Sequence, residues 1–463
     1  MAERQFKFSL PERILFASFP WLVLVAIVIF VPFLRVWWWM LVPLILYFEL
    51  HKVYLWWVRW DFNYTEKTWV VLEIVPPKEV LVPLKAMEDV FSVLWPVLYA
   101  PPNWREFWFE GVIPNGTEWM SFEIASFEGN IHFYMRATTS HASLIQSILY
   151  AHYPELEIRE VLDYTNNVPK GIPNAEWDTY GEDFIFTRDP AYPIKTYEKF
   201  FEPQGERISA EEKRIDPIGS LLENLGKIGP GEQFWLQFII SSVDTKEDAP
   251  EFLQGAHKII AKVSKRPEKK HESLIDHIMT ALFHIIRGPI REGTGENASY
   301  YWLESAKTES GERELLVTPG EREIITEVEN KIKKPIFRAV VRGLYAAKRE
   351  NWKSGNKTLT RAYFAHFGTQ HLNSIRFSPK TRPKTQYLFR KRIPLMRAKR
   401  QLRNYINRFT PFFPDRKREC MYLNPEEMAT IFHFPLKVSG LAMPTMARVE
   451  SKKSGPPPNL PVE

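Results

Sequence analysis

The longest apolar stretches of the chain lie in its first sixty residues. Residues 14–34 carry no charged side chain, and a helix of that length spans the roughly 30 Å hydrocarbon core of a bilayer. After Arg35, a second apolar stretch runs over residues 36–58 and is broken only by a short polar patch at residues 49–52. The pattern predicts a transmembrane helical hairpin within residues 1–60, with its turn at Arg35.

Tryptophans mark both ends of the second stretch. Indole rings favour the boundary between membrane and water, so the predicted membrane anchors are Trp37, Trp38, Trp39, Trp56 and Trp57. Basic residues gather before the first helix and after the second, which places both termini in the cytoplasm and the chain in the inner (cytoplasmic) membrane. A cleaved signal peptide does not fit, because the apolar run is too long and no cleavage site follows. A buried core hairpin is the alternative.

Beyond the hairpin, the apolar spacing alternates between strand and helix periods. We expect a membrane-proximal connector over residues 61–104 and a first α+β domain over residues 105–210. Within this domain, two strands surround the turn at residues 128–129, a helix begins at Ser140 and another strand follows Pro154. This β-β-α-β order predicts a ferredoxin-like sandwich, with helices on one face of an antiparallel sheet.

A second α+β domain of the same general kind is predicted over residues 211–380. Its strongest strand signals are residues 233–243 and 335–347, and between them Thr318 and Glu321 have the spacing of a capping box. The predicted fold class is α+β: a transmembrane hairpin, two ferredoxin-like units and an extended C-terminal tail. An internal duplication would explain two similar units, although no sequence repeat proves one.

The charged residues are unevenly distributed, with a strongly basic stretch near the C-terminus. The chain has 463 residues, 45% of them hydrophobic and 25% charged, which is typical of globular proteins. Its net charge is +6, yet residues 376–418 alone hold fifteen Lys or Arg and a single acid, Asp415. The one cysteine, Cys420, excludes an intrachain disulfide and any cysteine-based metal cage.

The C-terminal segment, residues 381–463, is predicted to combine a basic helix with an extended, proline-rich, partner-docking tail. Leu395, Leu402 and Ile406 fall on one helical stripe, with arginines around it. Such a helix can neutralise phosphates, lie on anionic lipid or dock on an acidic protein, and a solvated linker is the alternative. The residues predicted to contact a partner, DNA or anionic lipid are Arg390, Lys391, Arg392, Arg397, Lys399, Arg400, Arg403 and Arg408.

No arrangement of residues in the sequence points to catalysis. A phosphate-binding loop needs spaced glycines before a lysine and a Ser or Thr; Gly226-Lys227 is followed by isoleucine, and Lys357 has no partner glycine in register. His277 and His284 can share a helix face, but a metal site needs more converging ligands. We therefore expect a non-enzymatic protein without a cofactor. A hydrolase with a site around His277 is a less favoured alternative.

Four segments carry a family resemblance: Asp216–Glu223, Gly229–Gln237, Leu423–Pro435 and Pro444–Glu450. Together with the proline-rich end, they resemble an uncharacterised family of membrane-anchored proteins from candidate-phylum (Patescibacteria-type) bacteria. In that family, the region that contains these segments accompanies, or is fused ahead of, a type IV secretion or conjugation-type DNA-translocating ATPase. The resemblance covers most of the chain after the hairpin and offers no catalytic residues.

The segment Leu423–Pro435 also resembles the stretch that precedes the nucleotide-binding domain of those ATPases. That domain does not occur in this chain, so the resemblance implies a P-loop ATPase as a separate polypeptide, or this chain as a separated half. The residues of the segment expected to dock the ATPase are Glu426, Glu427, His433, Phe434 and Pro435.

The resemblance implies a non-enzymatic inner-membrane platform of a type IV secretion-like or DNA-translocation system. The platform would recruit and orient the ATPase at the cytoplasmic face, which raises its local concentration. The alternative is a membrane-tethered nucleic-acid-binding protein that uses residues 376–418. The expected partners are the lipid bilayer, the P-loop ATPase, DNA or anionic lipid, and further copies of the chain.

Overall fold

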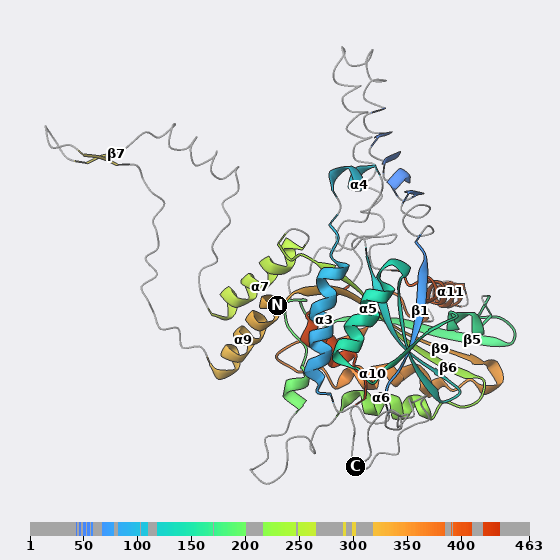
Figure 1. The fold of residues 1–463 in the computed structure, drawn as a ribbon. Coiled ribbons are helices and arrows are strands. Elements are labelled where there is room, and N and C mark those ends of the chain that lie inside the picture. The colour runs from blue at the N-terminus through green and yellow to red at the C-terminus, as the bar shows by residue number, and fades with distance from the viewer. Residues whose placement is uncertain are drawn as a thin grey trace, which may run out of the picture.

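A computed structural model gives the fold of the chain (Figure 1). It describes single helical positions between 43 and 58 and the ranges 67–77, 82–101, 103–109, 118–169, 171–200, 216–246, 249–264, 290–292, 299–301, 318–384, 390, 392–409 and 420–435.

Within these ranges, no helix is both long and apolar enough to cross a membrane. Residues 1–42, which include Trp37, Trp38 and Trp39, lie outside the described residues, as does Trp56. Trp57 is described, lies on a helix and is 49% exposed.

The described strands form a nine-stranded antiparallel sheet and a separate two-stranded hairpin. The order in the large sheet is β10-β5-β9-β6-β2-β3-β1-β4, and β11 pairs with β9. The strands are β1 (Trp69–Val75), β2 (Met120–Phe127), β3 (Asn130–Thr138), β4 (Glu157–Val161), β5 (Trp177–Phe186), β6 (Glu232–Val243), β7 (Ile290–Glu292), β8 (Ser299–Tyr301), β9 (Ile336–Lys348), β10 (Ile375–Phe377) and β11 (Met421–Leu423). The fold is thus mixed α+β and dominated by an antiparallel sheet, in line with the predicted class.

Helices cover both faces of the large sheet. One face packs on α3, α5, α6, α10 and α12, and the other on α11, which Figure 1 shows apart from the first group. Helices α7 and α9 pack together beside the adjoining ends of β6 and β9. The helices are α3 (Leu84–Leu98), α4 (Trp104–Trp108), α5 (Thr139–His152), α6 (Pro217–Gly226), α7 (Pro250–Val263), α9 (Pro319–Lys333), α10 (Leu359–Ala365), α11 (Arg392–Ile406) and α12 (Pro425–Ile431).

Local sequence accounts for the central elements. Successive side chains of a strand point to opposite faces, so Phe234 and Leu236 of β6 enter the helix-covered core while Trp235 lies on the α11 side. Helix α9 begins with the predicted capping box, in which Thr318 and Glu321 bond to each other's backbone N–H groups. The predictions of these two elements are confirmed.

The sheet contains the same chain path twice. In the first half, β1-α3-β2-β3-α5-β4 gives the strand order β4-β1-β3-β2; in the second, β5-α6-β6-β9-α10-β10 gives β10-β5-β9-β6. Each half therefore places its fourth strand beside its first and its third between its first and second. The halves meet where β2 pairs antiparallel with β6, with Phe122 opposite Phe238.

The repeated path does not begin at the sequence boundaries given above. Strand β1 and the whole of α3 fall in residues 61–104, the range expected to be a connector, and β5 falls in the range of the first domain but opens the second path. Because β1 lies between β3 and β4, the first half is incomplete without it.

Candidate docking surface

Helix α11 carries most of the basic residues that the sequence singled out. Ala398, Gln401, Leu402 and Tyr405 are buried and share one side of the helix, which packs across β5 and β9. Helix α11 lies very close to β5, because a Cβ atom added at Gly181 of β5 would lie 2.8 Å from the Cβ atom of Gln401. One side of α11 is thus fixed against the sheet, and the other faces outward.

The outward side of α11 is strongly cationic. Arg392, Lys399, Arg400 and Arg403 are exposed, as is Arg390 just before the helix. Among the described residues, no acidic side chain forms an ion pair with any of these cations. Leu395 and Met396 are also exposed on this helix. We call the exposed side chains of Arg392, Lys399, Arg400 and Arg403 the basic face.

Two further residues of the predicted set, Arg397 and Lys391, are not part of the basic face. The guanidinium of Arg397 is half-buried and donates to the Arg382 carbonyl at 3.2 Å, so it is partly used within the fold. Lys391 lies outside the described residues.

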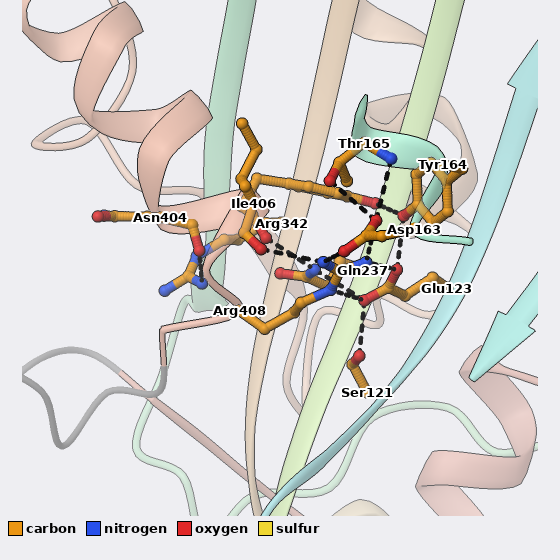
Figure 2. Close-up of polar contacts among 11 residues, drawn as sticks. Ser121, Glu123, Asp163, Tyr164, Thr165, Gln237, Arg342, Asn404, Ile406 and Arg408 are labelled. Carbon is orange, nitrogen blue, oxygen red and sulfur yellow. Dashed lines mark hydrogen bonds and ion pairs between the residues drawn. The ribbon is translucent and has the colours of Figure 1, made fainter. Parts of the chain in front are cut away.

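Arg408, just after α11, is buried rather than exposed (Figure 2). Its guanidinium contacts both oxygens of Glu123, with Nε and Nη2 each at 3.0 Å. Nη1 donates to Asp163 and to the Ile406 carbonyl, and Nη2 also donates to Asp163 at 3.1 Å. All five N–H donors of a guanidinium are therefore used inside the fold, and none remains for a partner at the surface.

Glu123 is the centre of this Arg408 cluster. Besides Arg408, its carboxylate accepts from the Ser121 hydroxyl and the Tyr164 hydroxyl, each at 2.6 Å, and from the Gln237 amide at 2.9 Å (Figure 2). The Tyr164 hydroxyl in turn contacts that of Tyr405 on α11, at 2.9 Å. Both oxygens of the carboxylate accept hydrogen bonds, so Glu123 joins β2 to β6, to the segment after β4 and to Arg408.

The electrostatics of the cluster favour its charged form. Burial by itself would raise the pKa of Glu123 and of Asp163, but the charge and hydrogen bonds of Arg408 outweigh it and hold both pKa values below their usual range. Burial would lower the pKa of Arg408, and attraction to Glu123 raises it instead. The cluster holds one cation between two carboxylates and fastens the end of α11 to β2 and to the loop after β4.

A second contact fixes the middle of α11. Arg342 of β9 donates to Asp183 of β5 at 3.0 Å and to the Asn404 carbonyl at 3.0 Å. Gln401 donates to the other oxygen of Asp183, also at 3.0 Å. The basic face is therefore held in one orientation by contacts on the opposite side of the helix.

The predicted docking segment Leu423–Pro435 lies inside the fold. Strand β11 pairs with β9, and α12 packs against α3. The ring of Phe434 packs against Phe133 and Tyr153, and Pro435 is buried.

The polar residues of this segment are also paired internally. The His433 ring nitrogens contact the Ala429 carbonyl and Asp216, each at 2.8 Å. Glu427 pairs with Lys331, and Glu426 pairs with Lys334 at 2.7 Å. These contacts leave no surface on which His433, Phe434 or Glu427 could meet a partner.

Sequence reasoning missed Glu123 and Tyr164, and it found no partner for the Asp163 carboxylate. The one available signal is Glu123 itself, the single charged residue of β2 (MSFEIASF), because a buried acid requires a partner. Within the ranges that the structure describes, no group of three or more His, Cys, Asp or Glu side chains could hold a metal ion. His277 and His284 lie outside those ranges.

The chain matches no protein-family model, and it has no significant match among curated proteins.

Proposed function

We propose that the chain is a non-enzymatic platform, anchored in the inner membrane by a transmembrane hairpin, that recruits and orients a separate P-loop ATPase of a type IV secretion-like or DNA-translocation system. We also propose that its body consists of two ferredoxin-like units. The strand order repeated in both halves, with the paired helices on one face, supports the second proposal. The segments that resemble the ATPase-associated family support the first.

One observation carries the docking role: the basic face is exposed, rigidly held and unpaired among the described residues. Four like charges within about three turns of helix repel each other, and an acidic or phosphate-bearing partner would relieve that repulsion. The contacts of Gln401, Leu402 and Tyr405 fix the direction in which these charges point, so a partner would bind in one orientation.

The test replaces Arg392, Lys399, Arg400 and Arg403 together by Gln in the full-length chain. Tagged protein is purified from detergent-solubilised, nuclease-treated native membranes, and bound proteins are identified by mass spectrometry. We expect a P-loop ATPase with the wild type and at least tenfold less with the variant. Deleting residues 420–463 would be a poor test, because 421–435 form part of the core.

A matched control removes the same charge elsewhere. Lys258 and Lys262 of α7 and Arg322 and Lys333 of α9 are exposed, and their joint replacement by Gln should leave capture of the ATPase unchanged. Equal loss in both variants would mean that net charge, not the basic face, governs the interaction. Absence of any ATPase from the wild-type sample would contradict the platform proposal.

A membrane-tethered nucleic-acid-binding protein is the second candidate, and the same basic face favours it. Cations that neutralise phosphates release bound counterions, so the logarithm of the DNA affinity falls with the logarithm of salt by about 0.9 per phosphate contact. The quadruple variant should therefore flatten this slope for duplex DNA, and the α7/α9 control should not. Failure of the wild type to bind DNA at low salt would exclude this candidate.

A further inference from the structure

A row of apolar side chains is exposed on the helical positions between 43 and 58. Their spacing follows one side of a helix, and their exposed fractions run from 40% for Leu46 to 63% for Val53. Neighbouring rings on this side contact each other, with Tyr54 and Trp57 centroids 6.5 Å apart. The row consists of Leu46, Tyr47, Leu50, Val53, Tyr54 and Trp57.

A second exposed aromatic surface comes from a distant part of the chain. Helix α4 starts with a capping box, in which Asn103 and Glu106 bond to each other's backbone N–H groups at 2.9 Å, so its geometry is well defined. Trp104 is 69% exposed and Phe109 is 54% exposed, and their rings meet edge to face at 5.6 Å. The exposed rings of Trp104 and Phe109 leave apolar surface in need of cover.

A hydrogen bond joins the two surfaces. The Tyr54 hydroxyl donates to the Phe109 carbonyl at 2.8 Å, and Figure 1 shows α4 beside the helical residues at the end of the molecule opposite α6. The bond links residues 55 positions apart in sequence, so Trp104 and Phe109 lie next to the apolar row. Together they form one aromatic collar.

We propose that α4 lies in the headgroup region of the bilayer, with Trp104 and Phe109 inserted, as a second membrane contact beside the hairpin. This inference rests on the proposed membrane anchoring. Two observations select lipid rather than a protein as the occupant. The apolar row lies in the second apolar stretch, residues 36–58, which follows the charge-free run 14–34. The exposed side chains of the collar are mainly Trp, Tyr and Phe, and tryptophan and tyrosine concentrate at the membrane interface.

The test places a fluorescent label at single cysteines in full-length protein reconstituted in phosphatidylcholine–phosphatidylglycerol nanodiscs. Cys420→Ser removes the native thiol, and the three reporters are Trp104→Cys on α4, Val53→Cys on the apolar row and Leu162→Cys after β4. Leu162 is 92% exposed and serves as the aqueous control for a label of the same hydrophobicity. Quenching by doxyl groups on the lipid chains is compared with quenching by aqueous iodide.

We expect the labels at 104 and 53 to be quenched several times more strongly by doxyl lipid than the label at 162, with the reverse order for iodide. If the label at 53 behaves in this way but the label at 104 resembles that at 162, the role of α4 is refuted while membrane anchoring stands. If neither 53 nor 104 senses lipid, membrane anchoring itself fails, and the inference fails with it. Thermal unfolding of each unlabelled variant verifies that the fold is retained.

Discussion

Two buried ion pairs hold the C-terminal part of the chain, and they respond to burial in opposite ways. In the Arg408 cluster, the pKa of Glu123 is lowered and that of Arg408 is raised. In the second pair, Lys331 of α9 and Glu427 of α12 lie 3.1 Å apart with both side chains 0% exposed. There, burial dominates: it lowers the pKa of Lys331 and raises that of Glu427.

The difference follows from the number of hydrogen bonds that replace water. Arg408 donates five and Glu123 accepts from four side chains, so the charged forms are well satisfied. Among the described residues, the ammonium of Lys331 donates hydrogen bonds to Glu427 and, at 3.4 Å, to the Tyr192 carbonyl, and it lies 4.9 Å from the centroid of the Phe186 ring. A planar guanidinium with five donors can compensate the loss of hydration, whereas a poorly surrounded ammonium does not.

Removing the guanidinium should have the largest effect on stability. Arg408→Met leaves Glu123 buried without its cation, which costs about 3–5 kcal/mol of unfolding free energy. Urea denaturation followed by tryptophan fluorescence measures the loss. Arg408→Lys restores the charge without the fork of donors and should recover less than half of it; full recovery would show that charge alone matters.

Lowering the pH should reduce the difference in unfolding free energy between the wild type and Arg408→Met. The pKa values of Glu123 and Asp163 are lowered from 4.5 and 3.8, so their stabilisation is complete above those values and is lost as the pH falls through the lower folded-state values. The variant has already lost that stabilisation, and protonation of its unpaired Glu123 favours its folded state. Repeating the denaturation series between pH 7 and pH 3 should give a difference in unfolding free energy that shrinks steadily as the pH falls. A constant difference would mean that Arg408 acts through packing alone.

Removing both charges of the Lys331–Glu427 pair together should cost less stability than removing the guanidinium of Arg408. Glu427 also accepts backbone N–H groups from Ile194 on Oε1 and from Asn424 on Oε2, each at 3.0 Å, and glutamine keeps only one of these two acceptors. We expect Lys331→Met combined with Glu427→Gln to lower the unfolding free energy by about 1–2 kcal/mol, because one backbone N–H loses its acceptor, and Lys331→Met alone to lower it by about 3 kcal/mol. A double variant as unstable as Arg408→Met would remove the contrast between the two pairs.

Sequence reasoning works where neighbours in the chain decide the outcome. The alternation along β6 and the capping box at Thr318 and Glu321 are local, and both were correctly predicted. The partners of Arg408 are not local: Glu123 is 285 residues away and Asp163 is 245 away. A basic stretch therefore predicts a charged surface but cannot reveal which one of its arginines the fold takes inside.

The segment Leu423–Pro435 shows the same limit. Its capping box at Asn424 and Glu427 is visible in the sequence, but nothing local indicates that Phe434 packs on Phe133 or that His433 meets Asp216. Strand β1 was assigned to a connector because its place between β3 and β4 depends on pairing partners that follow it by about 60 to 90 positions. Topology of this kind requires the folded structure.

The smallest effect is expected for the exposed cations. Arg400→Gln and Arg403→Gln each change the unfolding free energy by no more than about 0.5 kcal/mol, because neither side chain is paired among the described residues. Lys399→Gln should be neutral or slightly stabilising, since Lys399 and Arg403 are like charges four residues apart on one helix. Urea denaturation of the three variants beside Arg408→Met measures the contrast. A destabilisation above 1 kcal/mol in any of them would mean that the basic face has a structural role. Effects below that limit would mean that the quadruple variant stays folded, so that its loss of binding reports a lost contact with the partner. The arginine that stabilises the fold would then be Arg408, which a partner cannot reach.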